Sequence, residues 1–274
     1  MCSEYVSKNI PVIIEKAVGW KAVKLWDKEY LTEKLKNCSM TVDVTPNGRA
    51  DAINGKHFVK PEERKVEGFG KFLEMLENKQ EVCYIQHQNS NFDSEFKNFL
   101  EGDIDNDLKE YAAKMFGESD DVVTNLWIGD RRSVTSMHKD HYENFYAVIR
   151  GKKIFKLAPP QLLPYLEEKL YKSARYSKAS GEWTVVEEEP ESFTNWISVD
   201  VNKKGKFDLV QVEVNEGELL YLPSMWYHHV EQKEREEGDI VIAINFWHDM
   251  QFGPLFTYYK FVENILVQNL KKPI

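Results

Sequence analysis

The spacing of hydrophobic residues changes about halfway along the chain. In the first half, apolar residues such as Phe69, Phe72 and Leu76 recur every three or four positions, which is the repeat of a helix with one buried face. The pattern predicts helices over Ala22–Asn37, Val66–Asn78 and Ile104–Phe116, interleaved with short strands at Pro11–Glu15 and Met40–Val44.

Beyond Val122 the sequence consists of short β-branched and aromatic runs separated by turn-forming residues, a pattern typical of strands. Gly151, between two such runs, favours a tight hairpin turn. The predicted strands are Val122–Ile128, Asn144–Ile149, Lys153–Leu157, Leu209–Val214, Glu218–Leu222, Trp226–Val230 and Asp239–Trp247.

Residues 161–208 interrupt the strands with proline, lysine and the acidic run Glu187–Glu191. We interpret this segment as a solvated insertion, and the alternative is an acidic rim for a basic substrate. No internal repeat or low-complexity linker occurs, so we expect one domain. Its parts are a mixed helical support (1–121), a strand-rich core (122–250) and a C-terminal helix (253–274).

The C-terminal helix carries an apolar stripe close to one face. A terminal stripe of this kind has more apolar surface than its own domain readily covers, so we expect a homodimer through this helix. The alternative is that the helix packs back on its own domain. The stripe consists of Leu255, Tyr259, Val262, Leu266 and Leu270.

Composition excludes several classes of protein. The 274 residues are 42% hydrophobic and 13% aromatic, enough for a sizeable core. A net charge of −9 is the wrong sign for binding nucleic acid, so we expect no nucleic-acid partner. The longest apolar run, Ile240–Ile244, is far shorter than the roughly 18 residues of a membrane span. Cys2, Cys38 and Cys83 form no CxxC motif, so we expect a reducing compartment, the cytoplasm or nucleus.

The candidate chemistry lies among the histidines. The motifs GxGxxG, GxxxxGK[ST], GxSxG and HExxH are all missing from the sequence, which removes dinucleotide, P-loop, serine-hydrolase and zincin functions. On a strand, His138 and Asp140 project from one face, and a second histidine, His228, follows much later. Two His and one carboxylate form the facial triad of non-haem Fe(II) oxygenases. Because an HxD motif alone is common, an ordinary surface or core histidine remains the alternative.

The surrounding residues carry a specific resemblance. The segments Thr135–Asn144, Leu222–Val230 and Ile244–Trp247, together with Lys153, resemble the jumonji-C (JmjC) family of 2-oxoglutarate oxygenases. The resemblance continues upstream through Tyr84–Gln86, Val44–Asp51 and Pro61–Arg64. Since Ile10–Ile14 already resembles the first core strand of the family, we expect any amino-terminal helical cap to be missing or very short.

The resemblance implies a fold and a set of roles. The fold is mainly β with helical decoration: a double-stranded β-helix (jelly roll, cupin-like) of about eight strands in two packed sheets. His138, Asp140 and His228 would bind Fe(II). The co-substrate 2-oxoglutarate would chelate the metal at one end, while its other carboxylate meets Lys153, Thr135 and Tyr84, and dioxygen would be the oxidant. Asn144 and Asn245 would orient the chelating end, with Trp226 and Trp247 as walls of the site.

The resemblance also implies an activity on proteins. Its nearest members suggest lysyl C-3 hydroxylation of developmentally regulated GTP-binding proteins. The alternatives are an N-methyl-lysine demethylase of the same family, a metal-dependent peptidase and an inert cupin-like binding module. In the pair His228 and His229, the family pattern assigns His228 to the metal and leaves His229 as a supporting or core residue on the other face of its strand.

Overall fold

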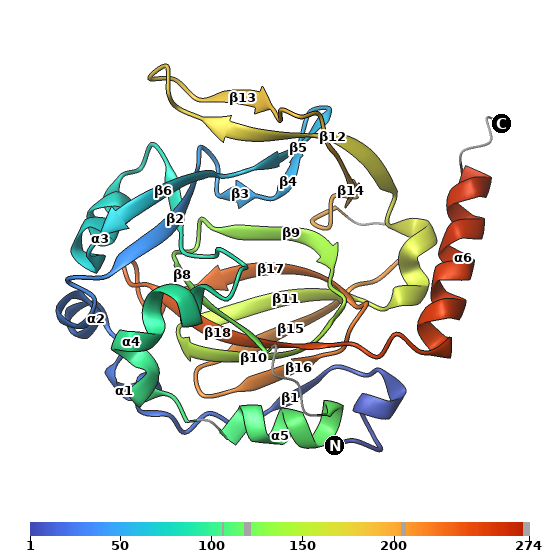
Figure 1. The fold of residues 1–274 in the computed structure, drawn as a ribbon, viewed down its shortest axis with the longest axis horizontal. Helices are drawn as coiled ribbons and strands as arrows, with labels where there is room; N and C mark the ends of the chain where they lie inside the picture. Colours follow the sequence, from blue (N-terminus) through green and yellow to red (C-terminus); the bar gives the residue numbers. More distant parts are fainter. Residues whose placement is uncertain (106, 118–121, 204–206, 271–274) are drawn as a thin grey trace.

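The computed structural model describes residues 1–105, 107–117, 122–203 and 207–270. Two five-stranded sheets stack on each other at its centre (Figure 1), in the orders β1-β16-β10-β18-β8 and β15-β11-β17-β9-β3. Eight of these strands come from the second half of the chain: β8 (Val123–Gly129), β9 (Val134–Lys139), β10 (Tyr142–Arg150), β11 (Lys152–Ala158), β15 (Val210–Asn215), β16 (Leu219–Leu222), β17 (Tyr227–Lys233) and β18 (Val241–Asp249). Two edge strands, β1 (Val12–Ile14) and β3 (Arg49–Ala50), come from the first half.

This arrangement confirms the predicted double-stranded β-helix, and each strand predicted in the second half is present. Gly151 connects β10 to β11 with φ +73°, and a Cβ there would lie 2.9 Å from the carbonyl oxygen of Lys233. Only glycine adopts this conformation at low cost. The hairpin predicted at Gly151 is therefore confirmed.

Alternate residues of the β1-β16-β10-β18-β8 sheet face opposite sides. Tyr146 and Val148 point between the two sheets, where they pack with Phe155 and Leu157 of β11. Phe145 and the other alternate residues belong to a separate core shared with the helical half. This sheet is buried on both faces, so its strands are apolar along most of their length.

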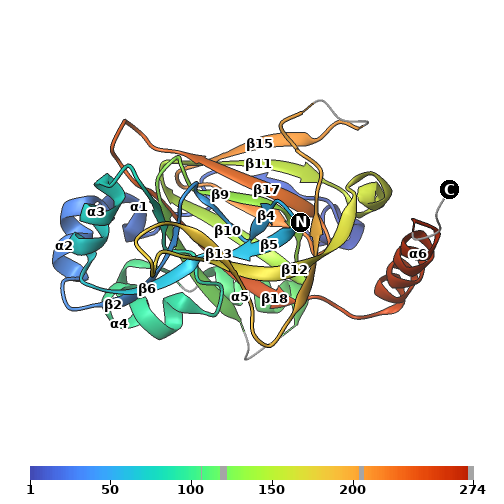
Figure 2. The same cartoon turned by 90° about the horizontal axis from the view of Figure 1, so that it is seen from above.

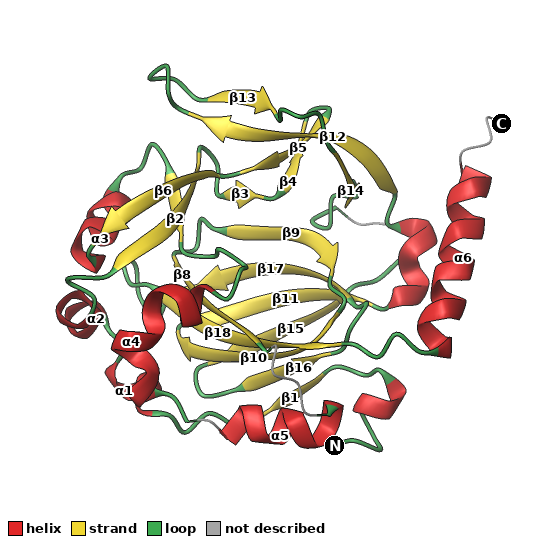
Figure 3. Ribbon diagram, viewed as in Figure 1, coloured by secondary structure: helices red, strands yellow, loops and turns green. Residues whose placement is uncertain are grey.

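Helices and a small sheet from the first half cover the outer face (Figure 3). The helices are α1 (Lys21–Leu25), α2 (Lys28–Lys34), α3 (Phe69–Glu77), α4 (Lys97–Leu100) and α5 (Asp107–Phe116), with a π-helix at Phe92–Phe96 and 3-10 turns at Val6–Lys8 and Glu101–Asp103. A further 3-10 turn, Pro160–Tyr165, follows β11 in the second half. The small sheet has the order β6-β2-β7, from β2 (Ser39–Thr45), β6 (Glu62–Glu67) and β7 (Val82–Tyr84).

Three predicted helix boundaries were wrong. The helix predicted over Ala22–Asn37 is divided, because the Asp27 side chain accepts a hydrogen bond from the backbone N–H of Tyr30 and starts a second helix. The helix predicted from Val66 begins at Phe69, because Val66 pairs with Met40 in the β2–β6 ladder. The helix predicted over Ile104–Phe116 begins at Asp107 rather than at Ile104.

The segment interpreted as a solvated insertion contributes three strands to a sheet. Strands β12 (Glu168–Ser177), β13 (Thr184–Glu187) and β14 (Phe193–Ile197) join β4 (Ala52–Asn54) and β5 (His57–Lys60) in a third sheet, at the top of Figure 1. Glu187 pairs with His57 and Lys172, and Glu188 pairs with Lys60. Much of the acidic run is thus neutralised within this sheet, which weakens the acidic-rim interpretation.

Helix α6 (Pro254–Leu270) lies at the margin of the molecule (Figure 2). Tyr259 and Leu266 pack against a cluster that contains Met137 and Tyr227. Other apolar side chains of α6 are exposed, with Leu255 84% and Tyr258 69% accessible, so the Leu255 end of the predicted stripe does not pack on the domain. The side chain of Leu270 and residues 271–274 lie outside the described part of the chain. No described helix is both long and apolar enough to span a membrane.

Candidate active site

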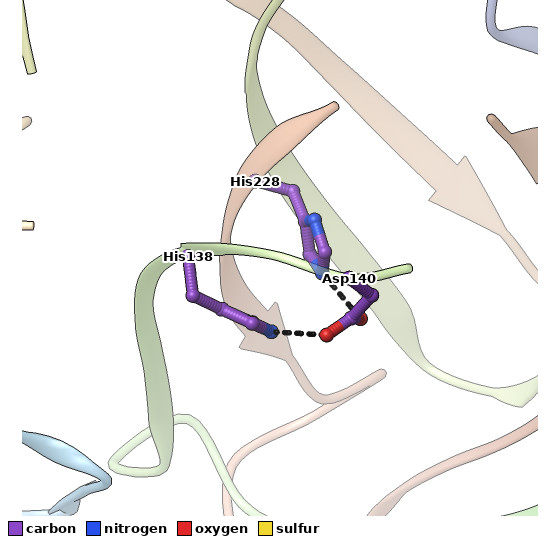
Figure 4. A group of neighbouring side chains, drawn as sticks. All are labelled: His138, Asp140 and His228. Carbon is purple, nitrogen blue, oxygen red and sulfur yellow. Dashed lines mark ion pairs between the residues drawn. The ribbon is translucent and has the colours of Figure 1, made fainter. Parts of the chain in front are cut away.

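His138, Asp140 and His228 converge at one end of the barrel (Figure 4). His138 of β9 and His228 of β17 are direct partners in the antiparallel ladder, and Asp140 follows the end of β9. The Oδ1 atom of Asp140 lies 3.7 Å from His138 Nε2, and Oδ2 lies 3.5 Å from His228 Nε2. One ligand atom from each residue lies within 4.8 Å of the others. Three donors this close together can bind a single metal ion.

The protonation of the two imidazoles suits a metal. Nδ1 of His138 lies 2.8 Å from the carbonyl oxygen of Ser136, and Nδ1 of His228 lies 3.0 Å from that of Trp226. Because a carbonyl oxygen only accepts, each Nδ1 is the donor, which leaves Nε2 of the neutral ring with a free lone pair. Burial, with His138 close by, lowers the pKa of His228 to about 4, which keeps this ring neutral. Neutral imidazole is the ligand form.

The carboxylate of Asp140 provides a further test of fit. Its Oδ2 atom is buried and has no hydrogen-bond partner within the described residues. An unpaired buried carboxylate oxygen costs free energy unless a cation or a donor satisfies it. The two free Nε2 atoms beside it offer no proton, so this donor set fits a divalent cation.

A β-bulge in β9 brings another side chain to the site. Lys139 pairs with Tyr227 and His138 with His228, but the next pair is Thr135 with Val230. Two residues of β9 therefore stand opposite one residue of β17, which resets the alternation of faces. As a result Thr135 and His138, three positions apart, line the same cavity.

The cavity beside the three residues has a polar wall built from neighbouring strands. Asn144 of β10 and Asn245 of β18 line it, and the Asn245 amide donates a 3.2 Å hydrogen bond to Oδ1 of Asn144. The indole N–H of Trp127 fixes Asn245 by donating to its Oδ1 at 2.8 Å. Trp247 also lines the cavity and stacks on Tyr142.

Lys153 is a buried cation farther along the barrel. It is 1% exposed, faces Gln232 across the β11–β17 ladder and donates hydrogen bonds to Gln232 Oε1 and to the hydroxyl of Tyr84, the latter at 2.8 Å. No carboxylate of the described residues pairs with its ammonium. Burial lowers the pKa of Lys153 to about 7. A buried lysine among neutral partners fits an anionic ligand.

Comparison with known proteins assigns the family. Residues 1–254 match the model of the cupin-like domain. The chain is 39% identical over 97% of its length to lysine-specific demethylase JMJ32 of Arabidopsis thaliana, covering 83% of that protein. It is 35% identical over 95% of its length to JmjC domain-containing protein E of Dictyostelium discoideum, covering 84%. It is 34% identical over 96% of its length to the human bifunctional peptidase and (3S)-lysyl hydroxylase JMJD7, covering 84%.

The chain belongs to the JmjC family. This confirms the resemblance found in its sequence. JmjC enzymes are 2-oxoglutarate-dependent oxygenases that use Fe(II) and dioxygen, so membership supports an oxygenase activity for this chain. The relatives include a demethylase and a lysyl hydroxylase at similar identity, and identity alone does not separate these two reactions.

The JmjC site also contains residues that the sequence analysis missed. Gln232 lies on the same face of β17 as His228 and Val230, so the alternation of a strand was a usable signal for it. Two further residues of the site, Trp127 and Gly129, could not be identified from the pattern of their own strand. A Cβ at Gly129 would lie 2.6 Å from the ring of Tyr84, so glycine lets that ring approach the strand.

The sequence predicted Trp226 and Trp247 as walls of the JmjC site and His228, rather than His229, as a metal ligand. Trp247 lines the cavity, but Trp226 does not; its indole N–H donates to the carbonyl oxygen of Asn9. His229 lies on the opposite face from His228, is 1% exposed, and its Nε2 lies 3.0 Å from Glu231. The geometry thus brings His228, and not His229, to the other two ligands.

The third sheet contributes to the JmjC site as well. Trp196 of β14 stacks on the ring of His138, with centroids 5.6 Å apart and an interplanar angle of 4°. Its indole N–H donates a 2.9 Å hydrogen bond to Ser136 Oγ. The segment first interpreted as an insertion therefore forms part of the wall around a candidate metal ligand.

Proposed function

We propose that this JmjC protein is an Fe(II)- and 2-oxoglutarate-dependent oxygenase that hydroxylates a lysyl residue of a protein substrate. The observation that carries the proposal is the combination of two features in one barrel. One is the His138, Asp140 and His228 donor set with its unsatisfied carboxylate oxygen. The other is Lys153, a buried lysine with neutral partners. The first suits a divalent metal, and the second suits the distal carboxylate of a dicarboxylate co-substrate.

In this proposal His138, Asp140 and His228 hold the iron on one face and leave the remaining positions to co-substrate and dioxygen. When bound, Fe(II) would supply the oxidising chemistry that inserts one oxygen atom into a substrate C–H bond. In the overall reaction 2-oxoglutarate and dioxygen become succinate and carbon dioxide, and the second oxygen atom enters succinate.

The other residues bind and orient the co-substrate. Lys153 holds its distal carboxylate through a charge-assisted hydrogen bond, with donors from the Tyr84 and Thr135 hydroxyls. Asn144 and Asn245 orient the end nearest the metal, and the Trp127 hydrogen bond keeps Asn245 in place. The aromatic wall with Trp247 limits the access of water to the reacting atoms.

The target is proposed from the relatives. The human relative is named as a (3S)-lysyl hydroxylase, which supports hydroxylation at C-3 of a lysine. For the substrate itself, the resemblance of the sequence to the JmjC family, and not the names of these relatives, leads us to propose a developmentally regulated GTP-binding protein. The second candidate is N-methyl-lysine demethylation, favoured by the Arabidopsis relative that is named as a demethylase.

Mass spectrometry of protein substrates separates these reactions. The chain is incubated with Fe(II), 2-oxoglutarate and either a GTP-binding protein or methylated lysyl peptides. A gain of one oxygen on an unmodified lysine supports the hydroxylase, whereas loss of a methyl group supports the demethylase. The His138→Ala variant is the control for reaction at the metal site.

Two other classes give different results in the same assay. A metal-dependent peptidase would cleave substrates without 2-oxoglutarate and dioxygen, using a metal-bound water. An inert cupin-like module would bind metal but consume no 2-oxoglutarate. Neither class has a use for a buried lysine such as Lys153, which is why the oxygenase is preferred.

We also propose that the chain forms a homodimer through α6. The support is the exposed apolar side chains of this helix: Leu255, Tyr258 and Phe261 are 84%, 69% and 62% exposed. Apolar exposure of this extent is typical of an interface. Light scattering of the Leu255→Arg/Phe261→Arg variant tests the proposal: we expect a monomer where the unmodified chain is a dimer. A monomeric unmodified chain would contradict it.

A further inference from the structure

The residues next to the candidate metal ligands meet on the back of their sheet. Lys139 stands between His138 and Asp140, and Tyr227 precedes His228. Because successive side chains of a strand alternate, both point away from the ligand face. They are register partners, and the ammonium of Lys139 donates a 3.0 Å hydrogen bond to the hydroxyl of Tyr227.

Helix α6 holds this pair from outside the barrel. Glu263 accepts a 2.7 Å hydrogen bond from Lys139, and Tyr259 lies within hydrogen-bond distance of both Lys139 and Tyr227, at 3.4 and 3.2 Å. The side chains of Lys139 and Glu263 are only 10% and 8% exposed. A buried, charge-assisted contact of this kind is stronger and more directional than a surface ion pair.

This contact lies at the end of the β9–β17 strand pairing. The β9–β17 ladder ends at Lys139, so Asp140 lies beyond the last strand pair. The carbonyl oxygen of Asp140 accepts a 2.9 Å hydrogen bond from the backbone N–H of Met225. The side chain of Lys139, the residue directly before Asp140, is held by Tyr227 and Glu263. It therefore restricts the backbone at the point where the chain leaves β9 toward Asp140.

We propose that α6 is a positioning element of the metal site. Glu263 and Tyr259 fix Lys139 and Tyr227, and these residues in turn fix Asp140 and His228 at the distances a metal ion needs. This inference rests on the proposed metal site. It assigns to the terminal helix a role distinct from dimer formation, because the residues involved lie on its inner side.

Cobalt binding tests the role without any turnover. Co(II) is titrated into the metal-free full-length chain without 2-oxoglutarate, and its dissociation constant and visible absorption spectrum are recorded. For Glu263→Gln we expect affinity to fall about 10-fold or more, the usual range for partners that support metal ligands. The absorption bands should also change, since these report ligand geometry. Tyr259→Phe should weaken binding less, because it removes one neutral hydrogen-bonding group.

Tyr111→Phe is the matched control, because it makes the same change at an exposed tyrosine of α5, 59% accessible, that has no part in the site or in the proposed dimer. Its affinity and spectrum should equal those of the unmodified chain. Thermal unfolding of each metal-free variant verifies that it is folded at the titration temperature. If Glu263→Gln is not folded, Lys139→Met/Glu263→Leu replaces it. This variant removes both charges of the buried Lys139–Glu263 pair, while Glu168, the more exposed second partner of Lys139, keeps its charge. The same 10-fold loss is expected because neither new side chain makes directional bonds.

The outcomes separate the two proposals. Unmodified affinity and spectrum in Glu263→Gln, or in the double variant where that one is used, would overturn the role of α6 and leave the metal site intact. Failure of the unmodified chain to bind Co(II) would overturn the metal site, and the inference with it.

Discussion

Lys153 and Tyr84 meet inside the barrel, where the ammonium donates a 2.8 Å hydrogen bond to the phenolic oxygen. They are 69 positions apart, one on β11 and the other at the end of β7. Both side chains are buried, 1% and 6% exposed. Burying an ammonium next to neutral groups is unfavourable, so this pair fits a binding site for an anion.

The first prediction concerns that pocket. Lys153→Met removes the charge, so we expect 2-oxoglutarate affinity to fall on the order of 100-fold, the worth of a strong hydrogen bond between charged groups. The metal-free chain should be as stable as before or more stable, because an unpaired buried charge is lost. Calorimetric titration and thermal unfolding measure the two effects. Lys152→Met is the control, because Lys152 pairs with Glu213 on the other face, and equal losses in both variants would contradict the assignment.

The second prediction is a pH dependence of co-substrate binding. Burial lowers the pKa of Lys153 from 10.5 to about 7, so above pH 7 the empty pocket loses its proton. A bound carboxylate favours the charged form, so binding takes up a proton, and affinity should fall by about tenfold per pH unit well above pH 7. Titrations at pH 8 in two buffers of different ionisation enthalpy count the protons. We expect uptake of close to one proton, and none in Lys153→Met.

The same group affects stability in the opposite direction. In the unfolded chain a lysine keeps its proton up to its ordinary pKa of 10.5. Between pH 7 and 10.5 the unfolded state therefore binds more protons than the folded state. Through this group the free energy of unfolding of the ligand-free chain should rise with pH across that window. A smaller rise in Lys153→Met than in the unmodified chain is the expected signature in denaturant titrations.

The third prediction separates the adjacent histidines. His228→Ala removes a ligand donor, so we expect loss of nearly all Co(II) or Fe(II) binding. His229→Ala should reduce binding only partly, because His229 faces away and contacts Glu231. Metal content after dialysis and 2-oxoglutarate turnover check the ranking. The reverse ranking would mean that β17 is out of register by one residue.

The fourth prediction concerns a residue without chemistry of its own. Gly129→Ala would place a Cβ 2.6 Å from the Tyr84 ring and 3.1 Å from Gln232 Nε2, so the partners of Lys153 must move. We expect 2-oxoglutarate affinity to fall about 10-fold, the loss of one hydrogen bond to a charged group, with metal binding retained. Gly19→Ala is the control, because no heavy atom lies within 4 Å of its Cβ. Unchanged affinity in Gly129→Ala would show that the pocket tolerates displacement of Tyr84.

Much of the barrel was determined by the sequence itself. The alternation of apolar residues is a local property, so the strands of the second half and the Gly151 turn could be predicted from their own residues. The HxD spacing of His138 and Asp140 alone was not specific, and it was the resemblance to the JmjC family that identified these two residues and His228 as candidate ligands. Local patterns fail at helix ends, where Val66 forms a strand because Met40 pairs with it.

Only the tertiary structure decided which distant residues meet and on which face. The bulge in β9 depends on its pairing with β17, and it places Thr135 beside His138 although a regular strand would separate them. The parallel pairing of β12 with β5 turned an apparently solvated segment into a sheet that brings Trp196 onto His138. These contacts depend on backbone hydrogen bonds between segments far apart in the chain, and such bonds leave no periodic signal in either segment.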